Sequence, residues 1–309
     1  MSVKGVHHIT AFSGDPQENV DFYSGLLGLR MVKVTVNFDD PGMYHLYYAD
    51  ALGTPGTGLT FFPVGAAPKG RRGYNEVVRI TLAIPEGSLG FWKDRLAAAG
   101  REVQEEGTSL LVLDPDGIEI SLEEGPMFPG WKRWDNSSIA PEHAIHGVRS
   151  TRFNSARPSS TENALTQLLG YRKISEEGEY DVFEAADGYN LIHLLRKRGD
   201  DPGSFGAGSI HHIAFRVESE HEQAAARAAV QKFGLYPTEV RDRQYFKSIY
   251  FREGGGILFE IATNGPGFAI DEPEEALGES LCIPPQYESL RPRLVNALLP
   301  IQNGDVKLP

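Results

Sequence analysis

The sequence has little cysteine, little positive charge and no long hydrophobic segment. Its single cysteine, Cys282, can form neither an intramolecular disulfide nor a zinc site built from several thiolates. The 30 lysine and arginine residues are outnumbered by 42 aspartate and glutamate residues, which gives a net charge of -12. Because an acidic chain repels phosphate backbones and anionic lipid, we expect no nucleic-acid partner and no membrane partner.

No apolar run approaches the ~20 residues that cross a bilayer. The apolar stretch of a signal peptide does not follow Lys4 either, so we expect a cytoplasmic protein. Apolar residues make up 40% of the 309 residues, which is enough for a sizeable core. At about 150 residues per domain, this length predicts two domains.

A module of one helix and four strands is visible at the start of the chain. A strand pattern at 3–12 precedes a helix that begins after Asp15, a favoured N-cap residue, and stops at Gly28. Three further strand-like runs follow, at 29–37, 43–49 and 58–64. The predicted order is therefore β-α-β-β-β.

The same order returns three times, in modules that begin at Glu76, His146 and Ser209. The phrase L-L-G-L-R at 26–30 is repeated as L-L-G-Y-R at 168–172. Repeats of this kind indicate copies of one structural unit. We therefore predict an α+β fold, with four βαβββ modules paired into two domains of curved mixed β-sheet and flanking helices.

A stretch rich in glycine, proline and serine separates the second module from the third, as is typical of a linker. The predicted organisation has an N-terminal domain with modules one and two, a linker, a C-terminal domain with modules three and four, and a tail that packs on the domains. Their bounds are 1–125, 126–143, 144–264 and 265–309.

Two histidine pairs occupy matching places in the repeat. Modules one and four begin with V-H-H-I-T at 6–10 and I-H-H-I-A at 210–214, which together hold four of the nine histidines. Module three has Gly147 in the second histidine position, and module two has no histidine there. Only module four has a carboxylate, Glu260, four residues after the glycine of its last hairpin, Gly256.

Glu260 stands between Phe259 and Ile261, where burial is costly unless a cation pairs with the carboxylate. Together with His8 and His212 it forms the set of two histidines and one carboxylate that holds non-haem Fe(II). Such a set leaves coordination positions open for a substrate and O₂. The same ligands are compatible with Mn, Zn or Ni.

Strand geometry separates the two members of each pair. Since side chains alternate along a strand, His7 and His211 are expected to point away from the metal face unless the strands twist or bulge. Thr10, two residues after His8, is expected to share its face. Spacing gives no partner for the five other histidines, which are His45, His143, His146, His193 and His221.

The modules resemble the vicinal-oxygen-chelate superfamily, which contains glyoxalase I, bleomycin-resistance proteins and type I extradiol dioxygenases. A closer resemblance is to the hydroquinone-type ring-cleaving dioxygenases, such as the 2,6-dichlorohydroquinone 1,2-dioxygenases. It runs over nearly the whole chain. The motifs that carry it are V-H-H-I-T, Y-H-L-Y-Y-A-D, I-H-H-I-A-F, D-R-Q-Y-F-K-S-I-Y and G-G-G-I-L-F-E.

The resemblance implies an Fe(II)-dependent, extradiol-type ring-cleaving dioxygenase that uses O₂ and a small dihydroxylated aromatic substrate, such as a hydroquinone. It implies iron between modules one and four, bound by His8, His212 and Glu260. It also implies an outer group of catalytic residues, which are His7, Thr10, His211, Arg243 and Tyr250. Arg241 is an alternative to Arg243 in this group. A homo-oligomer is the default expectation for such an enzyme.

Two other functions on the same fold stay open. A glyoxalase I-like isomerase or thiol transferase usually brings four protein ligands, often with two carboxylates. Module two has no carboxylate in the matching position, Ser121, although Glu119 lies two residues away. A drug-sequestering binding protein would lack a metal triad, so the presence of the triad favours an enzyme.

Overall fold

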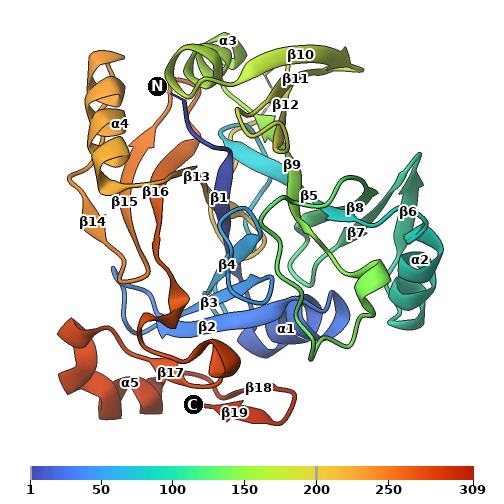
Figure 1. Ribbon diagram of the computed structural model, residues 1–309, viewed down its shortest axis with the longest axis vertical. Coiled ribbons are helices and arrows are strands. Elements are labelled where there is room, and N and C mark those ends of the chain that lie inside the picture. The colour runs from blue at the N-terminus through green and yellow to red at the C-terminus, as the bar shows by residue number, and fades with distance from the viewer. Residues whose placement is uncertain (1, 199–200) are drawn as a thin grey trace.

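A computed structural model of the protein describes residues 2–198 and 201–309. The larger of its two main sheets has nine strands in the order β14-β15-β16-β13-β1-β4-β3-β2-β17 (Figure 1). The bounds of these strands are β1 (Val6–Ser13), β2 (Arg30–Val36), β3 (Tyr44–Ala49), β4 (Gly58–Pro63), β13 (Ile210–Val217), β14 (Arg241–Asp242), β15 (Phe246–Arg252), β16 (Leu258–Pro266) and β17 (Leu281–Cys282).

The second sheet has eight strands in the order β10-β11-β12-β9-β5-β8-β7-β6, and a hairpin of β18 and β19 stands apart. The bounds are β5 (Glu76–Ile84), β6 (Val103–Glu106), β7 (Ser109–Leu113), β8 (Glu119–Glu124), β9 (Gly147–Asn154), β10 (Arg172–Glu177), β11 (Tyr180–Glu184), β12 (Leu191–Leu195), β18 (Ile301–Asn303) and β19 (Val306–Leu308).

The helices are short, and those of modules one and three continue as a π-helical turn. They are α1 (Pro16–Val20) with η1 (Asp21–Leu26), α2 (Leu89–Ala98), α3 (Pro158–Asn163) with η3 (Ala164–Leu168), α4 (Glu220–Lys232) and α5 (Arg291–Ala297). The 3₁₀ helices are η2 (Pro141–His143), η4 (Phe268–Ile270), η5 (Glu274–Ala276) and η6 (Pro285–Leu290). None of the described helices is long and apolar enough to cross a membrane.

The element order confirms the four predicted βαβββ modules. The first helix begins where the sequence predicts, because the Asp15 carboxylate accepts hydrogen bonds from the backbone N–H groups of Gln17 and Glu18, at 2.8 and 3.0 Å. The helical segment ends with η1 at Leu26, and Gly28 follows with a φ of +70°, which a residue without a side chain adopts readily.

Modules that share a sheet are not consecutive in the chain in one of the two sheets: the larger sheet joins the first and last modules, and the smaller sheet joins the two middle ones. Strand β1 pairs antiparallel with β13, which joins module one to module four, and β5 pairs antiparallel with β9, which joins module two to module three. Figure 1 accordingly shows the blue strands of module one beside the orange strands of module four. Each sheet contains strands from both 1–125 and 144–264. The sheets therefore do not define domain boundaries, and the division at these bounds stays a prediction.

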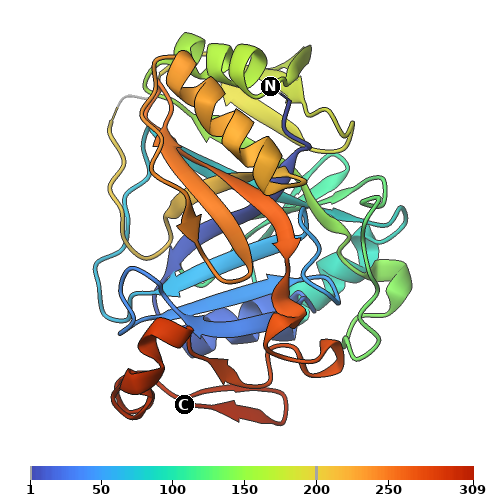
Figure 2. The ribbon, with the colours of Figure 1, turned by 60° about the vertical axis from the view of Figure 1, so that its left-hand side comes forward.

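The two faces of the nine-stranded sheet differ in chemistry. Helix α4 lies across β13, β15 and β16 and covers one face of that half of the sheet (Figure 2). Apolar residues fill the core, among them Ile9, Phe61, Phe215 and Ile261, each at most 1% exposed. The opposite face carries polar side chains at alternating positions, as strand periodicity requires, and it contains the candidate site.

The C-terminal segment packs on module one. Strand β17 adds to the edge strand β2 in parallel. Lys33 of β2 is fully buried, and its ammonium group donates to Asp271 and Glu272 at 2.6 and 2.5 Å. Gln17 of α1 also donates to the carbonyl of Gln302, at 2.9 Å. The tail of residues 265–309 therefore completes the edge of the larger sheet.

Candidate metal centre

Both histidine pairs stand at β-bulges, where β1 meets β13. The register between these strands shifts at two points, so that His7 is an additional residue on β1 and His211 is an additional residue on β13. A bulge re-aims a side chain relative to strict alternation. The Nδ1 atoms of His7 and His8 consequently lie 2.9 Å apart, and those of His211 and His212 lie 2.8 Å apart.

The expectation that His7 and His211 point away from the metal face made an exception for a twist or bulge, and the strands bulge at both residues. Each bulge places two imidazoles side by side instead of on opposite faces. Local strand periodicity does not reveal the bulge, since it is created by pairing with a strand about two hundred residues away.

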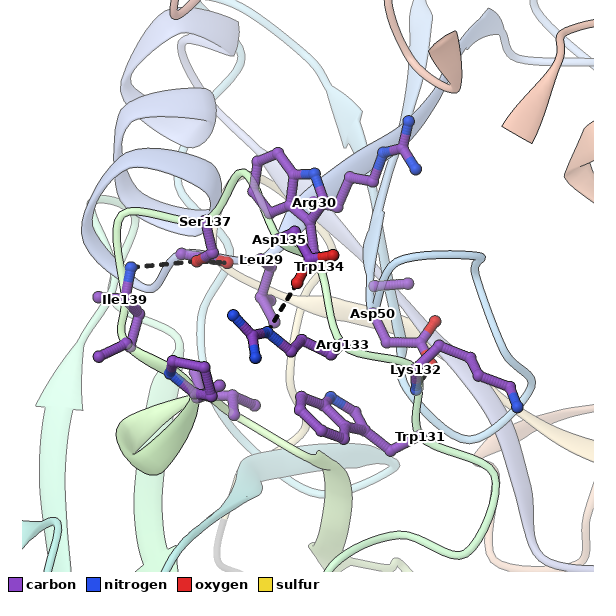
Figure 3. A pocket seen from close by; sticks show the side chains of 16 residues that line it. Leu29, Arg30, Asp50, Trp131, Lys132, Arg133, Trp134, Asp135, Ser137 and Ile139 are labelled. Atoms are coloured by element: carbon purple, nitrogen blue, oxygen red, sulfur yellow. Dashed lines mark hydrogen bonds and ion pairs between the residues drawn. The ribbon is translucent and has the colours of Figure 1, made fainter. Parts of the chain in front are cut away.

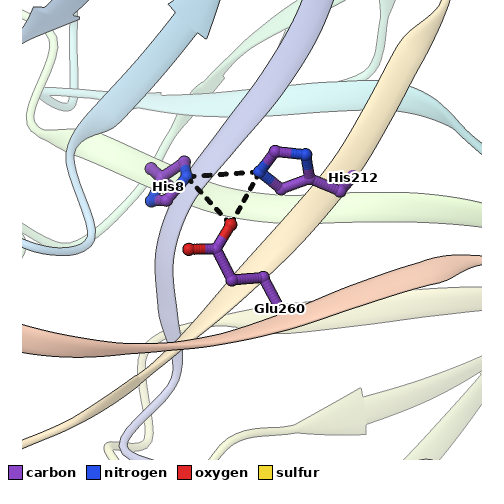
Figure 4. Close-up of side chains that lie close together, drawn as sticks. All are labelled: His8, His212 and Glu260. Atoms are coloured by element: carbon purple, nitrogen blue, oxygen red, sulfur yellow. Dashed lines mark hydrogen bonds and ion pairs between the residues drawn. The ribbon is translucent and has the colours of Figure 1, made fainter. Parts of the chain in front are cut away.

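Three adjacent strands bring His8, His212 and Glu260 together (Figure 4). The Nε2 atoms of the two histidines lie 3.4 Å apart, and Oε2 of Glu260 lies 2.8 Å from His212 and 3.5 Å from His8. All three side chains are at most 5% exposed. In the register of the sheet, Ala214 stands between His8 and Glu260, so only a methyl group occupies the space beneath the cluster.

The cluster has the properties of a divalent metal site. Ligand atoms bonded at about 2.0–2.2 Å and at right angles to one another are about 3 Å apart, close to the separations seen here. Ser248 donates a hydrogen bond to Oε1 of Glu260. The other oxygen, Oε2, is buried and faces the two imidazoles without a further polar partner among the described residues. A cation would complete its coordination.

The electrostatics favour the protonation states that a metal needs. Burial alone would raise the pKa of Glu260, but the facing imidazoles of His8 and His212 hold it well below its usual value. Burial lowers the pKa of His212. At neutral pH the cluster therefore offers a carboxylate and neutral imidazole, which are the forms that bind metal ions.

A hydrogen-bond chain assigns the tautomer of His8. The backbone carbonyl of Thr263 can only accept, so Nε2 of His7, at 3.1 Å, donates to it. A neutral His7 then accepts at Nδ1 from Nδ1–H of His8, and the lone pair of His8 lies on Nε2, toward the cluster. The ring of His211 takes the equivalent place beside His212, but it lines the cavity described next.

A cavity of about 250 Å³ opens beside the cluster. A cavity of roughly 150 Å³ accommodates benzene, so this volume suits a single substituted aromatic ring. Aromatic residues contribute much of the lining and can stack on such a ring. The lining residues are His8, Phe12, Asn37, Phe38, Asp39, His45, Tyr47, Phe62, His211, His212, Arg243, Phe246 and Tyr250.

Arg243 and Tyr250 lie together in this cavity. The guanidinium of Arg243 donates to the Tyr250 hydroxyl at 3.1 Å and to the carboxylate of Asp39 at 2.8 Å. Burial raises the pKa of Tyr250, so its hydroxyl remains a neutral hydrogen-bond donor. Arg241 is more than half exposed and lies 3.8 Å from the carboxylate of Asp39. Of the two arginines, Arg243 is therefore the one that lines the cavity.

Comparisons with known proteins identify the family. Residues 5–122 match the family model of the Glyoxalase/Bleomycin resistance protein/Dioxygenase superfamily. Over 305 residues the chain is 40% identical to MhqO of Bacillus subtilis, a protein named provisionally as a ring-cleaving dioxygenase, with 96% of each chain covered. The chain belongs to this superfamily. The predicted resemblance is confirmed.

Other comparisons extend over most of the chain. The chlorohydroquinone/hydroquinone 1,2-dioxygenase of Sphingobium indicum is 32% identical over 311 residues, which cover 96% of both chains. A crystal structure of a Bacillus subtilis protein titled as a provisional dioxygenase superposes with a TM-score of 0.92, at 39% identity and 98% coverage of both chains. Glyoxalase I of Zea mays, with a TM-score of 0.62 and 13% identity, shares the fold.

Several polar residues of the site escaped prediction from the sequence. Ser248 holds Glu260, and its place two residues before Tyr250 on β15 was the available signal. The hydroxyl of Thr10, which is expected to share the face of His8, bonds the hydroxyl of Thr60 at 2.7 Å. His45, for which spacing gave no partner, contacts Thr60 and the Tyr47 hydroxyl at 2.9 and 2.8 Å.

The four remaining histidines lie outside the cluster, in η2, just before β9, in β12 and in α4: His143, His146, His193 and His221.

A second cavity, of about 130 Å³, is bordered by the segment around Trp131–Ile145 and by the start of β2 (Figure 3). It contains none of the triad residues. Its Arg133 is already paired with Asp135 at 2.7 Å, which leaves this cavity without an evident chemical role.

Proposed function

We propose that this protein is an Fe(II)-dependent ring-cleaving dioxygenase that acts on a hydroquinone or a related dihydroxylated aromatic. The observation that carries the proposal is the cluster of His8, His212 and Glu260, which lies beside a cavity suited to one aromatic ring. The names of the relatives support dioxygenase chemistry and, for the Sphingobium indicum enzyme, a hydroquinone substrate. Iron and the extradiol-type outcome are our own assignment.

Bound Fe(II) would supply open coordination positions and the capacity to activate O₂. The chain's own residues bind and orient the substrate. The hydroxyl of Tyr250 can donate to an oxygen of the substrate, and Arg243 places a fixed positive charge behind it. The ring of His211 lines the cavity next to His212, where it can give or take a proton.

The ligand set favours a dioxygenase over a glyoxalase-like isomerase or thiol transferase. Among the described residues the cluster contains one carboxylate and two histidines. Glu119, the candidate for a second carboxylate, lies in the eight-stranded sheet and is bound to Arg79 at 2.7 Å. A three-ligand set leaves room for both a substrate oxygen and O₂, as an oxygenase requires.

Anaerobic reconstitution tests the proposal. The purified protein would be loaded separately with Fe(II), Mn(II) or Zn(II), and O₂ uptake would be measured with a panel of hydroquinones and catechols. We expect uptake with iron and at least one diol, with both atoms of labelled O₂ recovered in a ring-opened product. Glu260→Gln should show neither tight metal binding nor uptake. Turnover of methylglyoxal and a thiol, without O₂ uptake from any diol, would refute the proposal.

A further inference from the structure

A chain of hydrogen bonds crosses the side of the cavity formed by β4 and β3. Thr10 contacts Thr60 at 2.7 Å, Thr60 contacts Nε2 of His45 at 2.9 Å, and Nδ1 of His45 contacts the Tyr47 hydroxyl at 2.8 Å. All four side chains are buried. Since His45 and Tyr47 line the cavity, this buried chain ends at the place where a substrate would lie.

Tyr47 and the metal ligands come from different strands of one sheet. His8, His212 and Glu260 come from the consecutive strands β1, β13 and β16, whereas β4 and β3 follow on the other side of β1. In the sheet register, Thr60 lies between Thr10 and Tyr47. Tyr47, His8 and His212 all line this cavity, so a ring with one oxygen at the triad shares the cavity with the Tyr47 hydroxyl.

Two other polar groups of the cavity already have partners. Arg243 is bound by Asp39 and Tyr250, and the side chain of Asn37 accepts the backbone N–H of Asp39 at 2.9 Å. The Tyr47 hydroxyl bonds His45 alone among the described residues, and a hydroxyl has one donor and two acceptor positions. It therefore retains capacity for a further hydrogen bond.

Every member of the chain can both donate and accept. A neutral imidazole donates from one nitrogen and accepts at the other, and hydroxyl groups rotate to suit. When Tyr47 donates to His45, its oxygen can accept from a ligand hydroxyl. When each hydrogen bond of the series runs in the opposite direction, His45 donates to Tyr47 and the Tyr47 O–H can donate to that ligand. The site is thus suited to a hydroxyl, which itself plays either role.

We propose that Tyr47, positioned by His45 and Thr60, binds the substrate hydroxyl that lies farther from the metal and so selects hydroquinones over catechols. The two hydroxyls of a hydroquinone leave opposite ends of the ring, so one reaches β3 when the other is at the triad. In a catechol both hydroxyls stay beside the triad. The inference rests on the proposed function, because it assumes an aromatic diol with one oxygen at the triad.

Anaerobic binding to the Fe(II)-loaded protein tests this role without turnover. Hydroquinone, phenol and catechol would be titrated calorimetrically into the wild type, Tyr47→Phe and Tyr48→Phe. Tyr48 is the matched control, because it is the next residue on β3 and its buried hydroxyl has no hydrogen-bond partner among the described residues. One neutral hydrogen bond corresponds to roughly a five-fold change in affinity.

The wild type and Tyr48→Phe should bind hydroquinone roughly five-fold more tightly than phenol. In Tyr47→Phe the two ligands should bind equally, while catechol affinity is unchanged. His45→Gln, in which Tyr47 loses its orienting imidazole, should give an intermediate ratio and so provides a second variant if Tyr47→Phe folds poorly.

An unchanged ratio of hydroquinone to phenol affinity in Tyr47→Phe and His45→Gln, with metal content preserved, would overturn the inference. If the wild type cleaves hydroquinone in that case, the proposed function stands and only the subsite fails. If the wild type neither binds nor cleaves any diol, the proposed function itself fails. The two failures are therefore distinguishable.

Discussion

Removal of the Ser248 hydroxyl should weaken metal binding, although Ser248 is not a metal ligand. This hydroxyl donates to Oε1 of Glu260, and both side chains are fully buried. The bond fixes the rotation of the carboxylate, so that Oε2 faces His8 and His212. In Ser248→Ala the carboxylate loses this partner, and no water can easily replace it at a site without exposed surface.

The magnitude follows from two independent arguments. A buried acceptor that loses its donor costs about 1–3 kcal/mol. Loss of a group that orients a metal ligand typically lowers metal affinity about 10–100-fold, which corresponds to about 1.4–2.8 kcal/mol. Part of the cost destabilises the metal-free protein as well, so we expect a loss of affinity near the lower end, about ten-fold.

Competition with a chromophoric chelator under anaerobic conditions would measure this affinity for Fe(II). Ser13→Ala is the matched control, because Ser13 is also fully buried and its hydroxyl has no partner among the described residues. Equal metal affinities in Ser248→Ala and Ser13→Ala would show that the hydrogen bond does not orient Glu260. The account of the cluster given above would then be wrong in this respect.

Three further predictions concern the metal, the tail and pH. Glu260→Gln keeps the side-chain volume but removes the charge. Metal at 100 times its Kd should stabilise the folded wild type by about 2.7 kcal/mol, and this difference between thermal scans with and without metal should vanish in the variant. Lys33→Met leaves Glu272 buried without its cation, and urea titration should show a loss of about 3–5 kcal/mol. Lys93→Met, which breaks an exposed pair, should cost far less, because solvent screens the attraction between exposed charges. Burial holds the pKa of His45 well below its usual value, so only the unfolded chain binds a proton there below about pH 6.5. Acidification from pH 7 to 5 should lower the free energy of unfolding of the metal-free protein, by up to about 1.4 kcal/mol per pH unit from this residue. A slope in His45→Gln equal to that of the wild type would contradict the last expectation.

Much of the fold follows from local signals in the sequence. The N-cap at Asp15 and the stop at Gly28 bound the first helix, because capping depends on a few neighbouring residues. Comparison of the four modules with one another singles out His8, His212 and Glu260, since only modules one and four carry such side chains in matching positions. The structure brings these three side chains within 3.5 Å of one another.

The sequence by itself determined the repeated module, the places where helices begin and the residues that could bind a metal. Only the tertiary structure decided that β1 pairs with β13, and that this pairing bulges at His7 and His211. It also decided that Ser248 supports Glu260 and that His45 joins Thr60 to Tyr47. The physical reason is that helix caps and strand periodicity act between near neighbours. Strand register and side-chain hydrogen bonds across a sheet are instead set by segments far apart in the chain.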